Sequence, residues 1–160
     1  MTVKEIYDTI VAGKKYDYVR ATKHNDDMME NNVLAKDLPG IEEEFLSCSN
    51  YGCCLHYAMA LFKRLYEAGF ICYIAICLEE NPQTHSLSDM HCSVYYIEGC
   101  RKFIADPVET VKGGKDDYSH IPFDHYHEMH GTIWLYDPYG EHGDKPFFTD
   151  FLCFPQKTHN

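Results

Sequence analysis

The alternation of hydrophobic and polar positions is most regular over residues 54–68, where apolar side chains recur at helical spacing. One face collects the apolar residues, namely Leu55, Ala58, Met59, Phe62, Leu65 and Tyr66. Gly69 follows at the point where a left-handed residue commonly ends a helix. The pattern therefore predicts a helix over residues 54–68 that packs by one face and has Cys54 in its first turn.

Shorter patterns flank this helix on both sides. Residues 3–12 have the spacing of a short amphipathic helix, which Gly13 ends. Residues 70–78 are apolar on both faces and predict a covered central strand. Residues 132–136 predict a further strand, and residues 147–154 a last strand or packing tail.

Two short strands are predicted at residues 91–96 and 101–106, with Pro107 ending the second. We predict a type I′ turn at Glu98-Gly99 between them, because glycine supplies one of the positive φ angles that this turn requires. That turn places His91 directly opposite Asp106 on one face of the hairpin, with Cβ atoms roughly 5 Å apart.

The remaining stretches are polar and predict loops. Residues 14–40 read as irregular, with a helical turn around residues 28–35 and a break at Pro39-Gly40. Residues 79–90 predict a rim or lid, and residues 112–131 a long surface loop. Together the patterns predict one α+β domain over residues 1–160, in which a helix packs on a mostly antiparallel sheet.

Composition narrows the functional class. The 160 residues are 45% hydrophobic, which is typical of a globular protein, and the formal net charge of -11 argues against binding to nucleic acid or to anionic membranes. The N-terminal residues lack a signal pattern, so we expect a soluble cytoplasmic protein whose eight cysteines are reduced. Six of them are expected to be small buried apolar residues: Cys48, Cys72, Cys77, Cys92, Cys100 and Cys153.

Cys54 is the predicted centre of the chemistry. The positive end of the helix dipole and the unpaired N–H groups of the first turn favour its thiolate. His91, oriented by the carboxylate of Asp106, can take the thiol proton and later protonate a leaving group. The backbone N–H of Cys54 and the side-chain amide of Asn50 are the expected oxyanion donors.

Three motifs resemble those of the transglutaminase-like cysteine enzymes. They are Gly52-Cys53-Cys54-Leu55-His56-Tyr57-Ala58, His91-Cys92-Ser93-Val94-Tyr95 and Phe103-Ile104-Ala105-Asp106-Pro107. Their order also resembles that of arylamine N-acetyltransferases and bacterial transglutaminase-like proteases. The resemblance spans about residues 50–108 and implies a papain-like core with catalytic Cys54, His91 and Asp106. The aromatic residue that usually follows the histidine of this family is here Cys92.

The predicted function is hydrolysis or transfer of an acyl group from a protein, peptide or small amide, through an acyl-enzyme on Cys54 and without a cofactor. Hydrolysis by a peptidase, amidase or deamidase is favoured, because no acceptor-binding motif is readable. Two other classes stay open, namely a catalytically inactive protein-binding member of the same fold and a small zinc-binding module.

Several alternatives stay open at the level of residues. Cys53 competes with Cys54 for the role of nucleophile, and Asp137 competes with Asp106 as the partner of His91. Metal binding by a histidine cluster or by a cysteine cluster is the alternative to nucleophilic chemistry. The first cluster comprises His120, His125, His127 and His130 with Asp124 and Glu128, and the second comprises Cys53, Cys54, His91 and Cys92.

Overall fold

The computed structural model describes residues 1–80, 87–147 and 152–153. Its helices are α1 (Val3–Val11), α2 (Tyr18–Glu30), α3 (Leu38–Cys48), α4 (Cys54–Glu67), α5 (Pro107–Val111) and α6 (Phe123–His130), with a 3₁₀ turn at Ala35–Asp37. Its strands are β1 (Lys15–Tyr16), β2 (Tyr51–Gly52), β3 (Ile71–Glu80), β4 (Leu87–Glu98), β5 (Arg101–Ala105), β6 (Ile121–Pro122), β7 (Ile133–Tyr136) and β8 (Leu152–Cys153).

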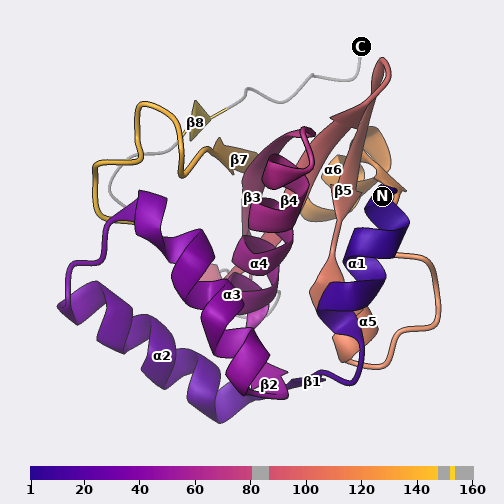
Figure 1. Ribbon diagram of the computed structural model, residues 1–160. Helices are drawn as coiled ribbons and strands as arrows, with labels where there is room; N and C mark the ends of the chain where they lie inside the picture. Colours follow the sequence, from indigo (N-terminus) through magenta and orange to yellow (C-terminus); the bar gives the residue numbers. More distant parts are fainter. Residues whose placement is uncertain (81–86, 148–151, 154–160) are drawn as a thin grey trace.

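Helices cover both faces of a six-stranded sheet with the strand order β6-β5-β4-β3-β7-β8, in which every pairing is antiparallel. Helices α1 to α4 lie over one face and α6 lies over the other (Figure 1). Alternate strand residues therefore enter two separate cores, such as Ile74 and Val94 on the α4 side and Tyr95 and Ile104 on the α6 side. The predicted α+β class and the central position of the first long strand are confirmed.

Helix α4 is the element around which the larger core forms. It runs over Cys54–Glu67, within one residue of the prediction, and all its residues from Cys54 to Phe62 are buried. Gly69 follows with φ of 90°, a conformation that costs glycine little. The helix packs against β3 and β4, and this packing sets the position of its first residue, Cys54, against β4.

The turn between β4 and β5 differs from the prediction by one residue. Glu98 pairs with Arg101, so Gly99 and Cys100 form the turn, and only Gly99 of these two has positive φ, which is the pattern of a type II′ turn. The register is consequently shifted by two residues, and His91 lies diagonal to Asp106 rather than opposite it. Because side chains alternate with a period of two, the shift leaves both residues on the same face.

The stretch before α3 is more helical than predicted. Residues 18–30 form α2, whose N-cap Asp17 accepts hydrogen bonds from the N–H groups of Val19 and Arg20. Pro39 lies in the first turn of α3, where its missing N–H costs nothing, so the predicted break at Pro39-Gly40 is wrong.

The predicted loops after α4 are also shorter than expected. Strands β3 and β4 extend into the predicted lid, of which residues 81–86 lie outside the described residues. Residues 112–131 contain β6 and α6 instead of forming one long loop. Of the predicted tail over residues 147–154, residues 152–153 form β8, while residues 148–151 and 154 lie outside the described residues.

Cysteine burial is confirmed in part. Cys72, Cys77 and Cys92 are buried, whereas Cys48 and Cys100 are exposed, so the prediction is wrong for these two. The side chain of Cys153 lies outside the described part. Within the described residues, the helices are too short or too polar to cross a bilayer.

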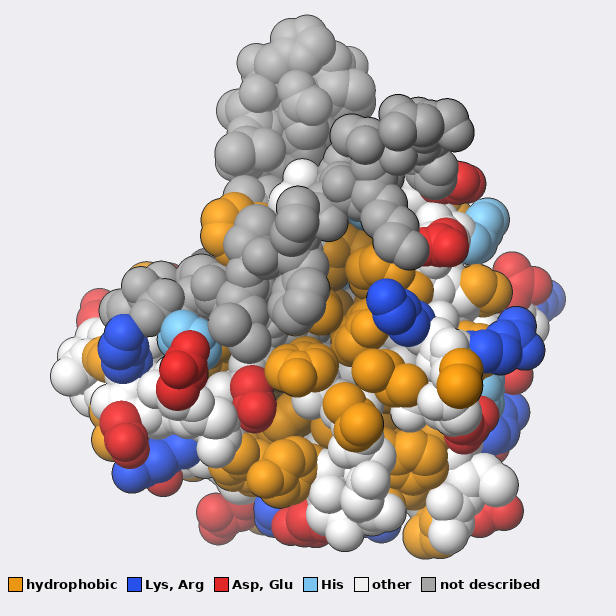
Figure 2. Space-filling model, turned by 90° about the horizontal axis from the view of Figure 1, so that it is seen from above, with side chains coloured by type: hydrophobic (Ala, Val, Ile, Leu, Met, Phe, Trp, Pro, Cys, Tyr) orange, Lys and Arg blue, Asp and Glu red, His pale blue; other side chains and the backbone are white. Residues whose placement is uncertain are grey.

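The molecule seen from above carries hydrophobic side chains near the middle of its surface and charged side chains around the edges (Figure 2). At the junction of α4 and β3, Tyr66 and Ile71 are exposed. This junction lies at the end of α4 opposite to Cys54, so the exposed apolar side chains are separate from the thiol.

Candidate functional site

The candidate site lies where β5 leaves the sheet. Strand β5 ends at Ala105, which pairs with Val94, and the chain turns into α5 at Pro107. The part of β4 before Val94, which includes His91, continues beyond the end of β5. The first turn of α4 and the end of β5 both reach this open edge of β4, and they bring Cys54 and Asp106 to His91.

His91 and Asp106 form the closest polar contact of the site. Nε2 of the imidazole and Oδ2 of the carboxylate are 2.7 Å apart, and the two side chains are nearly buried. The diagonal register is compatible with this contact, because both side chains are long enough to span it. Since Nε2 is engaged by Asp106, Nδ1 is the ring nitrogen left for the thiol.

Hydrogen bonds from three directions fix Asp106. Its backbone N–H donates to the carbonyl oxygen of Tyr118 at 2.8 Å, and its own carbonyl oxygen accepts from the Tyr7 hydroxyl at 2.9 Å. The Tyr126 hydroxyl donates to Oδ2 at 3.3 Å. The carboxylate is therefore held in one orientation, as an aspartate that orients a histidine must be.

Cys54 is 8% exposed, and its Sγ lies 3.7 Å from the carbonyl oxygen of Met90. Hydrogen bonding with Cys92 lowers the pKa of Cys54 most, followed by the hydrogen bond and the charge of His91, and together they outweigh burial. The pKa of Cys92 is raised by the same contact and by burial. The contact between the two thiols therefore shifts their pKa values in opposite directions, which favours ionisation of Cys54 over ionisation of Cys92.

The pKa of His91 moves in the complementary direction. Burial lowers it, but the charge and hydrogen bond of Asp106, together with the Cys54 thiolate, outweigh burial and raise the pKa of His91 to about 11. The pKa of the histidine is thus raised and that of the cysteine lowered, which are the directions that favour a thiolate–imidazolium pair.

The competition between the two adjacent cysteines is decided by their surroundings. Burial raises the pKa of Cys53 to about 12, and the charge of Cys54 adds to this effect. Cys53 is the N-cap of α4 and is 1% exposed. It is therefore a protonated structural thiol, while Cys54 points to the histidine.

Tyr16 is a site residue that sequence reasoning missed. Burial raises the pKa of its hydroxyl most, and the charge of Cys54 adds to this, while a hydrogen bond with the backbone N–H of Cys54 works against it. The hydroxyl thus lies at the N–H predicted as an oxyanion donor. Asn50 is exposed, and its backbone carbonyl oxygen accepts a hydrogen bond from the N–H of Lys15 at 2.7 Å. The role of its side-chain amide as an oxyanion donor stays a prediction.

A second buried histidine supports the start of α4. Nδ1 of His56 accepts from the N–H of Cys53 at 2.8 Å, in the manner of a capping box, and Nε2 lies 3.2 Å from Oε2 of Glu42. Gly52 packs against the same ring, and an added Cβ there would come within 3.2 Å of His56 and 2.9 Å of Leu46. These contacts fix the backbone that delivers Cys54.

The histidine-rich segment lies beside the site and does not form a solvated loop. His130 of α6 stacks on His91 with ring centroids 6.5 Å apart and contacts Tyr126 at 4.1 Å. No local signal distinguishes Tyr126 from the polar residues around it, because α6 buries little more than this one side chain.

The group of side chains whose geometry suits a metal ion shares only His91 with the predicted clusters. Among the described residues, the one group of histidine, cysteine and carboxylate side chains with ligand atoms mutually within 4.8 Å is His91, Asp106 and Glu109. The histidine cluster and the cysteine cluster supply no such group in this part of the chain. Glu109, on the first turn of α5, has no sequence signal of its own.

Asp137 lies away from the site. It follows β7, whose Tyr136 pairs with Ile74, whereas His91 pairs with Cys77 three residues farther along β3. Since Asp137 follows Tyr136, the offset grows to four residues, which separates Asp137 from His91 by about 13 Å along the strand direction. Asp106, not Asp137, is thus the carboxylate that contacts His91.

No protein-family model matches the chain, and no curated protein matches it significantly.

Proposed function

We propose that the protein is a cysteine-nucleophile enzyme of the transglutaminase-like class, with a papain-like core, that cleaves or transfers the acyl group of an amide or peptide substrate. The observation that supports this most strongly is the linked arrangement of Cys54, His91 and Asp106, in which the pKa of the thiol is lowered and that of the imidazole is raised. Structural ion pairs also shift pKa values, but here the shifted imidazole contacts the thiol of a cysteine in the first turn of a helix, which is where reactive cysteines occur.

In the proposed first step, the Cys54 thiolate attacks the carbonyl carbon and the carbonyl electron pair moves onto oxygen. We assign the oxyanion to the backbone N–H of Cys54, which would exchange the Tyr16 oxygen for the substrate oxygen, and to the Tyr16 hydroxyl as a second donor beside it. The His91 imidazolium then protonates the leaving amine as the C–N bond breaks, which leaves a thioester on Cys54.

In the second step, the neutral imidazole of His91 accepts a proton from water or from an acceptor amine as it attacks the thioester. Collapse of the intermediate releases the acyl product and returns the thiolate–imidazolium pair. Asp106 keeps Nε2 protonated throughout, so that Nδ1 is the atom that exchanges protons.

The proposal is tested by trapping the acyl-enzyme. The protein is mixed with p-nitrophenyl acetate, release of p-nitrophenol is followed by absorbance, and the adduct is mapped by peptide mass spectrometry. We expect a burst of about one equivalent and a single acetyl group on Cys54, lost in Cys54→Ser while the circular dichroism spectrum is unchanged. Acetylation spread over exposed Cys48 and Cys100, with Cys54 unmodified, would contradict it.

A further inference from the structure

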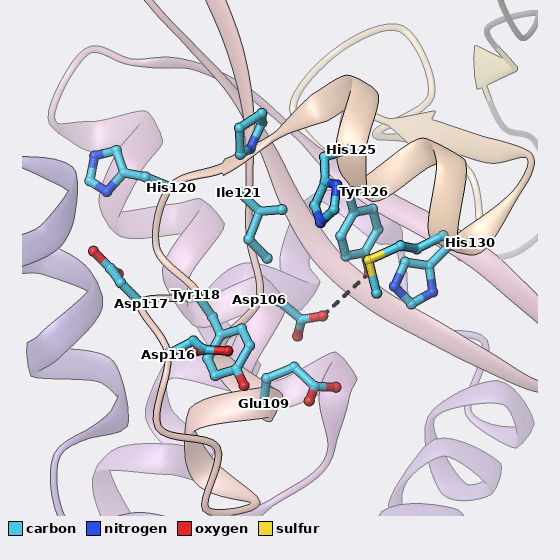
Figure 3. Close-up of a pocket in the computed structure, with 12 residues that line it drawn as sticks. Asp106, Glu109, Asp116, Asp117, Tyr118, His120, Ile121, His125, Tyr126 and His130 are labelled. Carbon is cyan, nitrogen blue, oxygen red and sulfur yellow. Dashed lines mark hydrogen bonds between the residues drawn. The ribbon is translucent and has the colours of Figure 1, made fainter.

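A pocket of about 490 Å³ opens at the carboxylate end of the proposed triad (Figure 3). Asp106 and Glu109 lie at its base, the loop with Asp116 and Tyr118 forms one wall, and α6 forms the opposite wall. One imidazole ring separates Asp106 from the thiol, so the pocket begins roughly 8 Å from Cys54. The proposed mechanism does not use this space.

The wall opposite α6 depends on Gly114. A Cβ on Gly114 would lie 2.6 Å from the Tyr118 hydroxyl and 2.7 Å from the carbonyl oxygen of Glu109, so only glycine lets this loop close against α5. The backbone hydrogen bond from Asp106 to Tyr118 ties the same loop to the end of β5. The pocket is thus bounded by packed segments.

The pocket is acidic, and one of its acceptors lacks a donor. Four carboxylates line it, those of Asp106, Glu109, Asp116 and Asp117, and none of the described lining residues is lysine or arginine. Asp106 is 1% exposed, and its Oδ1 has no hydrogen-bond partner among the described residues, whereas Oδ2 is engaged by His91 and Tyr126. A buried carboxylate oxygen without a donor is costly, and a donor in the pocket would satisfy it.

The shape and lining of the pocket select among cations. The volume far exceeds that of a metal ion, and a metal at Nε2 of His91 would have to displace the proton shared with Asp106. Tyr118, Tyr126 and Met129 supply aromatic and apolar walls for an aliphatic stem or a flat group. A guanidinium combines a planar face with several N–H donors that can reach two carboxylates at once.

We propose that this pocket is a subsite for the guanidinium group of an arginine side chain, bound by Oδ1 of Asp106 and the carboxylate of Glu109. Its link to catalysis rests on the proposed function: an arginine in the pocket would lie about two to three residues of extended chain from the carbonyl that Cys54 attacks. The net charge of -11 favours the approach of such a cationic peptide.

The test is an NMR titration of the ¹⁵N-labelled protein, in the presence of EDTA, with Nα-acetyl-arginine amide and with its neutral isostere Nα-acetyl-citrulline amide. We expect arginine amide to shift amide signals of residues 106–130 and citrulline amide to bind at least tenfold more weakly. Glu109→Gln should weaken arginine binding at least tenfold. Glu67→Gln, which removes the same charge at the far end of α4, should leave it unchanged.

Each other outcome overturns the assignment. Equal binding of the arginine and citrulline amides would show that the pocket does not recognise positive charge. Equal binding of Nα-acetyl-lysine amide would show that it accepts any alkyl cation and does not select guanidinium. Stoichiometric Zn²⁺ uptake that Glu109→Gln abolishes, without arginine binding, would make the group a metal site. Repeating the titration on Cys54→Ala separates the two proposals, because arginine binding does not require a reactive thiol.

Discussion

Two histidine–carboxylate pairs lie on either side of the first turn of α4, and they differ in what the histidine faces. His91 and Asp106 are 2.7 Å apart beside a thiol and a pocket, whereas His56 and Glu42 are 3.2 Å apart in a completely buried setting. His56 uses its second ring nitrogen for a backbone N–H, and His91 keeps its second nitrogen for Cys54. A histidine–carboxylate pair thus supports the backbone in one place and lowers the pKa of a thiol in the other.

The largest effect is expected on removing His56 from the structural pair. His56→Ala removes the imidazole that contacts the buried Glu42 carboxylate and the Cys53 N–H, so we expect a loss of about 3 kcal/mol in the free energy of unfolding. Urea unfolding measures this loss. In the fraction that remains folded, the rate of Cys54 alkylation should stay within about twofold of wild type; a large drop there would mean that His56 also tunes the thiol.

Removing His91 should instead change the reactivity of Cys54. His91→Ala returns Cys54 to a thiol with an ordinary or higher pKa, of which only a few per cent is ionised at pH 7, so we expect alkylation by iodoacetamide to slow about 30-fold. Stopped reactions analysed by peptide mass spectrometry give the rate. His91→Gln, which retains bulk and polarity, serves as the control for packing, and an unchanged rate in both variants would remove His91 from the site.

Neutralising each carboxylate in turn tests whether the two histidine–carboxylate pairs have different roles. Asp106→Asn takes away the charge that raises the pKa of His91, which weakens the ion pair, and we expect about tenfold slower alkylation of Cys54 at pH 7. Glu42→Gln is the matched change at the structural pair and should alter the rate by less than about twofold. Equal effects of the two substitutions on the rate would contradict the separate roles of the two pairs.

The smallest effect is expected at Cys92. Cys92→Ala removes a hydrogen-bond donor that lowers the pKa of Cys54. Because a neutral thiol is a weak donor whereas the imidazolium of His91 carries a full charge, we expect the rate of alkylation at pH 7 to fall only about threefold. Cys72→Ala is the matched control, because Cys72 is a buried cysteine on the neighbouring strand β3 and its Sγ contacts the carbonyl oxygen of Phe62. A faster rate in Cys92→Ala would show that Cys92 holds the nucleophile back.

The sequence was sufficient for the elements with strong periodicity. Helix α4 and strand β3 bury continuous apolar patterns, and Gly69 marks the boundary between them. The hairpin register was misplaced by two residues because Gly99 fits either position of a two-residue turn. That slip does not change faces, which is why His91 and Asp106 were still expected together.

The helices that were missed owe their stability to contacts outside their own sequence. Helix α2 is polar and begins at a cap, Asp17, and α6 is short and held mainly by buried Tyr126. Tyr16 and Glu109 were missed at the site for a related reason. Each is a common residue in a short segment, and only the packing of β1 on β2 and the turn of α5 bring them to Cys54 and Asp106.

The most direct test of the ion pair is the pH dependence of Cys54 alkylation, followed by peptide-resolved mass spectrometry in the wild-type protein. Because the pKa of Cys54 is lowered and the pKa of His91 is raised to about 11, the thiolate forms as pH rises through the lowered value of Cys54, and the rate should already be on its plateau at pH 7. A rate that is still rising at pH 7 and is half-maximal only near pH 8.5, as for a free thiol, would contradict the ion pair and the enzyme built on it.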